Sequence, residues 1–202
     1  DGRVSTVAFD NVPSFVSALA ETVEVPGMGT IEFDLAYGGA FYAYVDADQI
    51  EPALVPENAR EIARIGMAIK RAVADSVDIE HPSEDDLSFL YGTIFRGAAE
   101  DEIAASRNVC VFADGQIDRS PTGTGVSGRL AIQHERGDLD PGEPFVVESI
   151  IGTRFTGRIA DTTSVDDMAA VIPTVEGSAS ITGRSEFVLD PEDPLRDGFL
   201  LG

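Results

Sequence analysis

The amino-acid sequence predicts an α+β fold, in which two helices interrupt a chain otherwise made of strands. Apolar residues recur at helical spacing in two segments, residues 57–76 and 122–137. Elsewhere, short apolar or alternating runs are separated by glycine and proline, which is typical of strands and turns. The chain has 202 residues, of which 43% are hydrophobic, enough to build a real core. We therefore expect a mixed sheet accompanied by two substantial helices.

The first fifty residues are predicted to form strands. Residues 3–13 alternate in part, and residues 22–47 contain apolar runs that break at Pro26-Gly27 and at Gly38-Gly39. Glycine inside a strand pattern indicates a bulge or the close approach of another part of the molecule.

The clearest helix follows Pro56, a residue suited to a first helical turn. Within residues 57–76, one face carries Ile62, Ile65, Ile69 and Val73, while most of the basic residues lie elsewhere. The next three segments, residues 77–81, 87–95 and 108–115, are predicted to be strands.

The second helix is predicted to start near Thr122 and to stop at Gly137. Val126, Leu130 and Ala131 mark its expected inner face. Residues 144–160 and 169–189 are again typical of strands and turns, and the closing residues 190–202 are polar until near the end.

The charge of the chain narrows the classes of partner. It carries 36 acidic residues against 14 Lys and Arg, a formal net charge of −22, and Lys70 is the only lysine. Because phosphate binding needs a basic face, nucleic acid and anionic membranes are not expected as partners. Acids spread along the chain with almost no lysine resemble proteins of salt-accumulating halophiles, in which salt shortens the range of repulsion. An ordinary acidic cytosolic protein is the alternative.

Other compositional features exclude several kinds of site. Cys110 is the single cysteine, which excludes an internal disulfide and a cysteine-built zinc site. The two histidines, His81 and His134, lie far apart in sequence, and we expect no metal and no organic cofactor. No run of about twenty apolar residues offers a membrane span. The first residues show neither an initiator Met nor a signal peptide, so we expect a cytoplasmic protein and a chain that is part of a longer one.

The segment DRSPTGTGVSG, residues 118–128, carries the clearest functional signal. The start of a helix presents unpaired backbone N–H groups and the positive end of the helix dipole. Gly123 and Gly125 leave those groups accessible, so the segment suits a carboxylate, and Asp118 could hold an ammonium or secondary amine. Thr122 would then face whatever lies between them, as in an amino-acid pocket. The alternative is a turn followed by an N-cap, since Ser and Thr are common before helices for capping alone.

The same residues resemble the second signature of the proline racemase family, which includes hydroxyproline epimerases and trans-3-hydroxy-L-proline dehydratases. The similarity extends to residues 37–47, His81-Pro82, residues 90–95 and residues 106–121, and so covers essentially the whole chain. It implies the fold of diaminopimelate epimerase: two similar lobes, each a mixed sheet wrapped around a central helix, with the active site between them. Nothing in this chain matches the Cys-Gly-His stretch of the first lobe. The resemblance therefore implies that residues 1–202 form the second lobe, and that the C-terminal segment, approximately residues 190–202, returns to a missing N-terminal lobe.

Thr122 departs from the racemases and epimerases, which carry a cysteine here, one of two thiols that remove and deliver the Cα proton. Threonine at this position resembles the dehydratase branch. A threonine hydroxyl is far too weak an acid to replace a thiol with a pKa near 8.5, so reprotonation from that face should fail. A base on the other face could still remove the proton, and a 3-hydroxyl could be expelled. The resemblance thus implies a lyase acting on trans-3-hydroxy-L-proline, with Thr122 catalytic; a proline racemase or hydroxyproline 2-epimerase, or a non-catalytic imino-acid-binding lobe, are the alternatives.

The remaining candidate residues would bind the substrate, an imino acid such as hydroxyproline or proline. Asp118, Gly123 and Thr124 belong to the signature, and the aromatic residues Phe112, Tyr91 and Phe41 could line a pocket for a pyrrolidine ring. Core packing explains Phe112 about as well, and Tyr91 and Phe41 are weaker cases of the same kind. Cys110 lies in an apolar segment and is interpreted as a packing residue, His81 as part of a turn, and His134 as solvent-facing. The sequence leaves the oligomeric state open, a homodimer included.

Overall fold

A computed structural model describes residues 3–199 of the chain. Its strands form one sheet in the order β1-β10-β2-β3-β4-β5-β6-β8-β9, with β7 beside β6, and an additional pairing of β10 with β9 closes the sheet on itself. The pairs β4–β5 and β6–β8 are parallel and the other pairs are antiparallel. The strands are β1 (Arg3–Asp10), β2 (Ser14–Val25), β3 (Gly29–Tyr37), β4 (Phe41–Asp46), β5 (Leu90–Gly97), β6 (Ser106–Phe112), β7 (Gln116–Ile117), β8 (Phe145–Glu148), β9 (Arg154–Val165) and β10 (Met168–Ser180). The predicted α+β class with a mixed sheet is confirmed.

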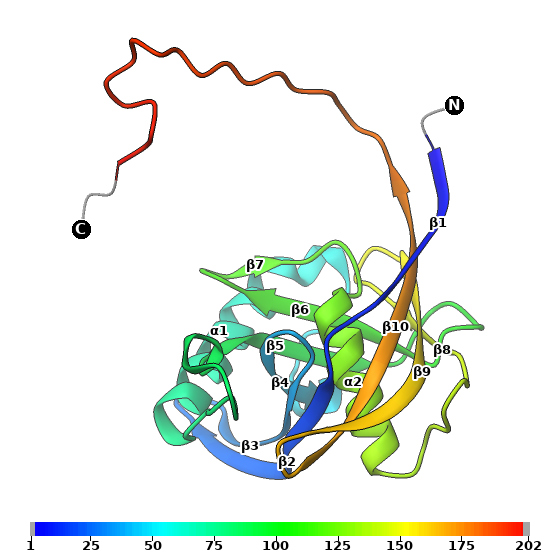
Figure 1. The fold of residues 1–202 in the computed structure, drawn as a ribbon. Helices are drawn as coiled ribbons and strands as arrows, with labels where there is room; N and C mark the ends of the chain where they lie inside the picture. Colours follow the sequence, from blue (N-terminus) through cyan, green and yellow to red (C-terminus); the bar gives the residue numbers. More distant parts are fainter. Residues whose placement is uncertain (1–2, 200–202) are drawn as a thin grey trace.

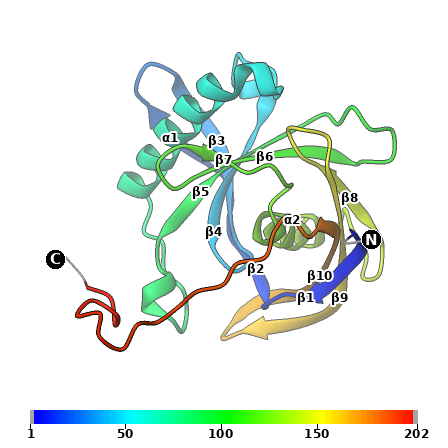
Figure 2. The ribbon, with the colours of Figure 1, turned by 90° about the horizontal axis from the view of Figure 1, so that it is seen from above.

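Helix α2 (Gly123–Glu135) runs through the inside of this closed sheet, where Figure 2 shows it surrounded by strands. Every residue from Gly125 to Ile132 is buried. The sequence predicted the position of this helix correctly but expected a single inner face. Because strands surround the helix, all of its sides are buried, and the arrangement of a sheet around a central helix is confirmed.

Glycines let the helix fit inside the sheet. A Cβ atom on Gly128 would collide with the Tyr44 hydroxyl, and one on Gly125 would collide with Ile94. Tyr44 uses the space to donate a hydrogen bond from its hydroxyl to the carbonyl of Gly125, at 2.9 Å. A larger residue at either glycine would force the first turns of α2 away from the sheet.

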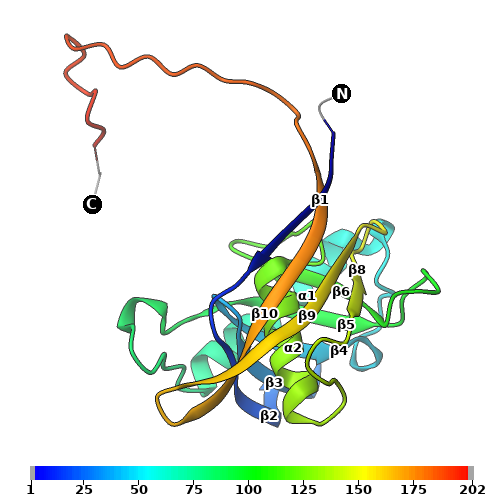
Figure 3. The ribbon, with the colours of Figure 1, turned by 45° about the vertical axis from the view of Figure 1, so that its right-hand side comes forward.

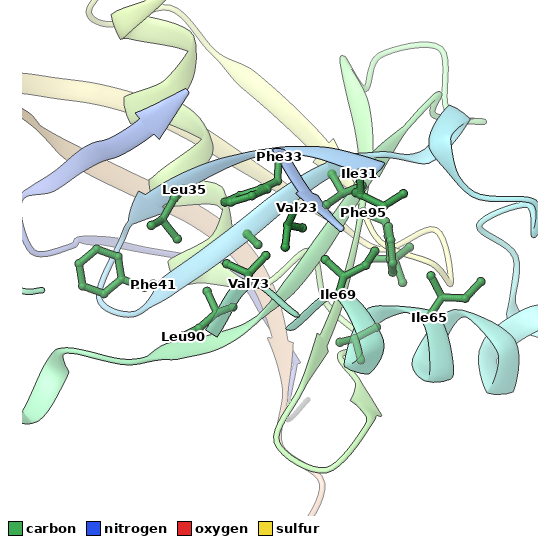
Figure 4. Close-up of a cluster of buried hydrophobic side chains, with 14 of the residues drawn as sticks. Val23, Ile31, Phe33, Leu35, Phe41, Ile65, Ile69, Val73, Leu90 and Phe95 are labelled. Carbon is green, nitrogen blue, oxygen red and sulfur yellow. The ribbon is translucent and has the colours of Figure 1, made fainter. Parts of the chain in front are cut away.

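Helix α1 (Ala59–Ser76) covers the outer surface of the sheet (Figure 1). Ile62, Ile65, Ile69 and Val73 are buried, as the periodicity predicted, and Figure 4 shows the last three directed toward the side chains of β2, β3 and β5. Burial of one such side chain stabilises the fold by about 1.5–3 kcal/mol. The preceding 3-10 helix η2 (Pro56–Asn58) contains the proline that was expected near the helix start.

Strand β4 separates two parts of the core because its side chains alternate. Phe41, Ala43 and Val45 face the core beneath α1, whereas Tyr42 and Tyr44 face the side of α2. The prediction that Phe41 lines the substrate pocket is therefore corrected: Phe41 is fully buried and packs against Phe15 and Tyr37.

An ionic network anchors the far end of α2. Asp34 is 1% exposed and accepts hydrogen bonds from Arg96 at 2.5 Å and from Arg136, just after α2, at 2.8 Å. The same carboxylate accepts a hydrogen bond from the backbone N–H of Ala20, at 3.0 Å, where φ is +54° and the pairing of β2 with β3 is irregular. One buried carboxylate therefore connects β2, β3, β5 and the end of α2.

One predicted strand is absent from the described part of the chain. Residues 77–81 form no strand, because α1 ends at Ser76 and the chain then turns back over the aromatic core. His81 packs 4.6 Å from Tyr37, ring centre to ring centre, and its Nδ1 accepts a hydrogen bond from the N–H of Glu84 at 3.2 Å, so it lies in a turn as expected.

His134, near the end of α2, is half-buried rather than solvent-facing, with Nδ1 3.3 Å from the carbonyl of Leu139.

Residues 181–189, the end of a segment predicted to contain strand and turn, continue beyond β10 as an extended segment that leaves the closed sheet (Figures 1 and 3). Ile181, Phe187, Val188, Leu189, Leu195 and Phe199 are exposed along this segment and its continuation. The expected return segment lies at residues 190–202, of which residues 200–202 fall outside the described part. A docking role for this segment stays a prediction.

Candidate active site

A cavity of about 590 Å³ opens at the start of α2. It brings together residues from β1, the turn between β3 and β4, β4, β5, β6 and the loop that precedes α2. Its lining consists of Phe9, Gly39, Ala40, Tyr42, Tyr91, Cys110, Phe112, Asp118, Thr122, Gly123 and Thr124. Of the predicted site residues, only Phe41 is missing from this set.

Thr122 has a strained backbone at the entrance to the helix. Its φ and ψ are +69° and 108°, a conformation that branched side chains rarely adopt. Its side chain makes no capping hydrogen bond to the helix; the Oγ1 hydroxyl instead donates to Oδ2 of Asp118, at 3.0 Å. The N-cap interpretation of this hydroxyl therefore does not hold.

Asp118 is held in place by the loop that it precedes. Its Oδ1 accepts a hydrogen bond from the N–H of Ser120 at 2.8 Å, and the Ser120 hydroxyl accepts one from the N–H of Thr122 at 3.1 Å. The carboxylate is half-buried and lines the cavity. A fixed negative charge at this position can pair with a cation that enters the cavity.

The first turn of α2 offers backbone donors to the same cavity. Within residues 3–199, no group accepts a hydrogen bond from the N–H of Gly123, Thr124 or Gly125. Gly123 and Thr124 line the cavity, and the helix dipole is positive at this end. These features can bind a carboxylate in the same cavity as Asp118.

The turn between β3 and β4 fixes this helix start from the other side. A Cβ on Gly38 would collide with the carbonyl of Thr124, so only glycine permits this approach. Asn11 links this turn to α2: its Nδ2 donates hydrogen bonds to the Gly38 carbonyl and to the Ser127 hydroxyl, both at 2.9 Å. The sequence predicted a bulge or a close approach at Gly38-Gly39; the structure shows a close approach, and the partner is α2.

An aromatic wall forms part of the cavity lining. The rings of Tyr91 and Phe112 stack at 5.8 Å with an interplanar angle of 10°, and Tyr42 meets Tyr91 edge-on at 5.7 Å. Tyr91 is 37% exposed and Phe112 is half-buried, so the wall is open to a ligand. An apolar ring of the size of pyrrolidine can rest against it.

Sequence reasoning missed Tyr42 and Phe9 and dismissed Cys110 as a site residue. The alternation in β4 could have placed Tyr42 opposite Phe41, but it could not say which side faced the cavity. Cys110 is 1% exposed at the base of the cavity, beside Thr122. Burial raises the pKa of its thiol to about 12, and contact with Thr122 lowers it only in part. The thiol is therefore protonated near neutral pH and is not a base.

Within the described residues, no group of three or more His, Cys, Asp and Glu side chains is arranged to hold a metal ion. The described helices include none whose length and apolar character would let it cross a membrane.

Comparison with known proteins gives a consistent result. The chain is 46% identical over 198 residues to a trans-3-hydroxy-L-proline dehydratase of Colwellia psychrerythraea, covering 98% of this chain and 56% of that protein. It is 40% identical over 201 residues to a proline racemase of Clostridioides difficile, covering 100% of this chain and 60% of the racemase. A crystal structure of a hydroxyproline epimerase from Agrobacterium vitis with bound trans-4-hydroxy-L-proline superimposes with a TM-score of 0.84 at 39% identity, covering 98% of this chain and 56% of that one. The chain thus spans a little over half the length of these relatives.

The sequence pattern described as proline racemase matches residues 1–200, almost the whole chain. The resemblance inferred from residues 118–131 is thereby confirmed, and the chain belongs to the proline racemase family.

Proposed function

We propose that this chain is the second lobe of a lyase that dehydrates trans-3-hydroxy-L-proline to Δ1-pyrroline-2-carboxylate. The observation that carries the proposal is the Thr122 hydroxyl at the helix start, hydrogen-bonded to Asp118 at 3.0 Å, where the racemases of the family use a thiol. A second thiol does not replace it, because Cys110 is the only cysteine of the chain and its pKa is raised by burial to about 12.

In this proposal, three groups orient the substrate. The Asp118 carboxylate binds the ring ammonium, the N–H groups of Gly123 and Thr124 bind the substrate carboxylate, and the rings of Tyr91 and Phe112 contact the apolar face of the pyrrolidine. The substrate Cα then lies next to Thr122. Each charged end of the substrate meets an opposite charge, which is the requirement for a defined orientation.

The chemistry requires one base and one leaving group. A base from the part of the protein outside this chain removes the Cα proton, and the electron pair released forms the Cα–Cβ double bond. The bond between C3 and its oxygen breaks, and the departing hydroxide takes a proton to become water. The resulting enamine then rearranges to the cyclic imine. No oxidant or reductant is needed.

Thr122 has a defined part in this sequence. Its single proton is donated to Asp118 in the structure, and the substrate ammonium would compete for that carboxylate. The hydroxyl would then be free to donate to the departing oxygen. It cannot return a proton to Cα efficiently, because an alcohol is many orders of magnitude weaker as an acid than a thiol. Elimination is therefore favoured over inversion.

The test uses the full-length two-lobed protein with trans-3-hydroxy-L-proline, followed by NMR. We expect the imine to accumulate, with no inversion of L-proline to D-proline. Inversion of the substrate at Cα would instead make the protein an epimerase, and binding without turnover would make it an imino-acid-binding protein. The 202-residue chain alone is the matched control, and we expect no turnover from it because the base lies elsewhere.

A further inference from the structure

Two hydroxyl groups of the cavity have no part in the reaction described above. The Tyr42 hydroxyl and the Thr124 side-chain hydroxyl are hydrogen-bonded to each other at 2.8 Å, and both residues line the cavity. They come from different elements, β4 and α2, and meet only because the sheet closes around the helix.

The pair has an unused proton. Each hydroxyl has one donor and two acceptor positions, and the bond between them consumes one donor. Among the described residues, neither hydroxyl has another hydrogen-bond partner. Because both residues line the cavity, this proton is available to a ligand that can accept it.

The other polar groups of the cavity either are hydrogen-bonded in the structure or have a part in the proposed reaction. Thr122 donates to Asp118, and Asp118 accepts from the N–H of Ser120. The helix N–H groups suit the substrate carboxylate, and the rings of Tyr91 and Phe112 form an aromatic wall. The hydroxyl pair is thus a further polar group that can meet the ring hydroxyl of the ligand, in addition to the Thr122 hydroxyl that acts on the departing oxygen.

The pair is rigid, as a selective site requires. The Tyr42 ring is held edge-on by Tyr44 at 6.2 Å and by Tyr91 at 5.7 Å, and Tyr42 is 2% exposed. The methyl group of Thr124 lies against Gly39, where a Cβ would approach it to 3.0 Å, and this contact directs the hydroxyl toward Tyr42. Burial also raises the pKa of Tyr42 above its ordinary value of 10.0, so the phenol keeps its proton.

We propose that the Tyr42–Thr124 hydroxyl pair determines substrate specificity by hydrogen-bonding the ring hydroxyl of a hydroxylated imino acid. This inference rests on the proposed function and deepens it. A site built to bond a hydroxyl discriminates against an analogue that lacks one, because the partner groups of the site are then left unpaired.

The test compares the full-length protein with its Tyr42→Phe variant, which removes one oxygen and keeps the ring. The readout is the apparent affinity for trans-3-hydroxy-L-proline divided by that for L-proline, using KM or Ki where turnover occurs and calorimetric Kd where it does not. We expect Tyr42→Phe to lower this ratio roughly tenfold to a hundredfold while affinity for L-proline changes less than about twofold. Thr124→Val should lower the ratio in the same direction. Tyr44→Phe is the matched control, because its hydroxyl bonds Gly125 outside the cavity, and the ratio should stay unchanged.

The outcomes separate the two proposals. A ratio unaffected by both cavity variants, an equal loss for both ligands, or an unmodified protein without preference for the hydroxylated ligand would each overturn the role of the pair. An unmodified protein that prefers the hydroxylated ligand but does not dehydrate it would refute the lyase proposal and leave the specificity role intact. Melting curves of each variant show whether its fold persists.

Discussion

The hydroxyl of Thr122 donates a hydrogen bond to the carboxylate of Asp118 across 3.0 Å, instead of capping helix α2. The backbone of Thr122 lies in a left-handed conformation, with φ of +69°. Conformations of this kind cost of order 1–3 kcal/mol and persist where the surrounding structure holds them. Thr122 thus combines a strained backbone, a hydrogen bond to Asp118 and a place in the cavity wall. This combination supports a chemical role for its side chain.

The first prediction concerns the charge of Asp118. Asp118→Asn in the full-length protein should weaken the binding of L-proline roughly tenfold to a hundredfold, because a charge-assisted hydrogen bond to the ring ammonium contributes about 1.5–3 kcal/mol. Calorimetric titration measures the effect. Asp114→Asn, in the exposed turn between β6 and β7, is the matched control and should bind normally. Equal affinities for all three proteins would remove Asp118 from the amine site.

The buried face was predicted correctly for α1 but not for α2, and the difference has a structural cause. Helix α1 packs on one face, so the spacing of Ile62, Ile65 and Ile69 revealed both its bounds and its buried side. Helix α2 is enclosed, so Ser127 and Arg129 are buried together with Val126, and no periodic stripe marks its inner face. The residues at its two ends predicted the bounds of α2. Its position at the centre of the sheet was predicted only from the resemblance to the family.

The sequence predicted those residues of the site that lie in one continuous segment. Asp118, Thr122, Gly123 and Thr124 are neighbours in sequence, and the chemistry of a helix start brings them together. Tyr42 reaches the cavity through the closure of the sheet, which no local pattern encodes. The prediction of a strand at residues 77–81 was wrong for a similar reason. Contacts of His81 with aromatic residues distant in sequence outweigh the local preference for a strand.

A second prediction follows from the buried thiol and phenols. The pKa of Cys110 is raised by burial from 9.0 to about 12, and burial also raises the pKa values of Tyr42 and Tyr44 above 10.0. These groups ionise first in the unfolded chain, so the stability they contribute is present below pH 9 and is lost as pH rises from 9 toward 12. The thiol alone should remove about 1.4 kcal/mol per pH unit in that window.

Urea denaturation at pH 8, 9, 10 and 11 measures this loss. Cys110→Ala should reduce the fall in the free energy of unfolding between pH 9 and 10. An identical fall in the variant would mean that the thiol is not held protonated in the folded protein.

The third prediction concerns the ionic network at the end of α2. Asp34→Asn should reduce the free energy of unfolding by about 3–5 kcal/mol, because Arg96 and Arg136 would lose their shared buried partner. Asp46→Asn is the control, since the Asp46 side chain is 51% exposed and such pairs contribute about 0–1 kcal/mol. Chemical denaturation measures the free energy of unfolding of each variant. If both variants lost the same small amount, the network would not anchor the helix.

The fourth prediction comes from the net charge of −22. Molar potassium chloride shortens the Debye length from about 8 Å to about 3 Å, so repulsion between acidic side chains should weaken and Tm should rise. Thermal melts across a salt series test this, with an uncharged osmolyte at equal osmolality as the control. A Tm that is constant in salt, or that rises equally with the osmolyte, would speak against adaptation to high salt.

The central claim is that the hydroxyl of Thr122 is what makes the site eliminate rather than invert. Thr122→Cys would put a thiol at the start of α2, where the helix dipole and free N–H groups lower its pKa. The new thiol would lie beside Cys110, so the assay needs a reductant, and the Thr122→Cys variant in a Cys110→Ala background excludes a disulfide between them. Cys110→Ala alone is the matched control.

The decisive measurement is the conversion of L-proline, a substrate with no 3-hydroxyl to expel, to D-proline by the full-length Thr122→Cys protein. The account predicts inversion in this variant and none in the unmodified protein, together with slower dehydration of trans-3-hydroxy-L-proline. A folded variant that binds L-proline yet shows no inversion at Cα would contradict the assignment of Thr122 to the second-base position.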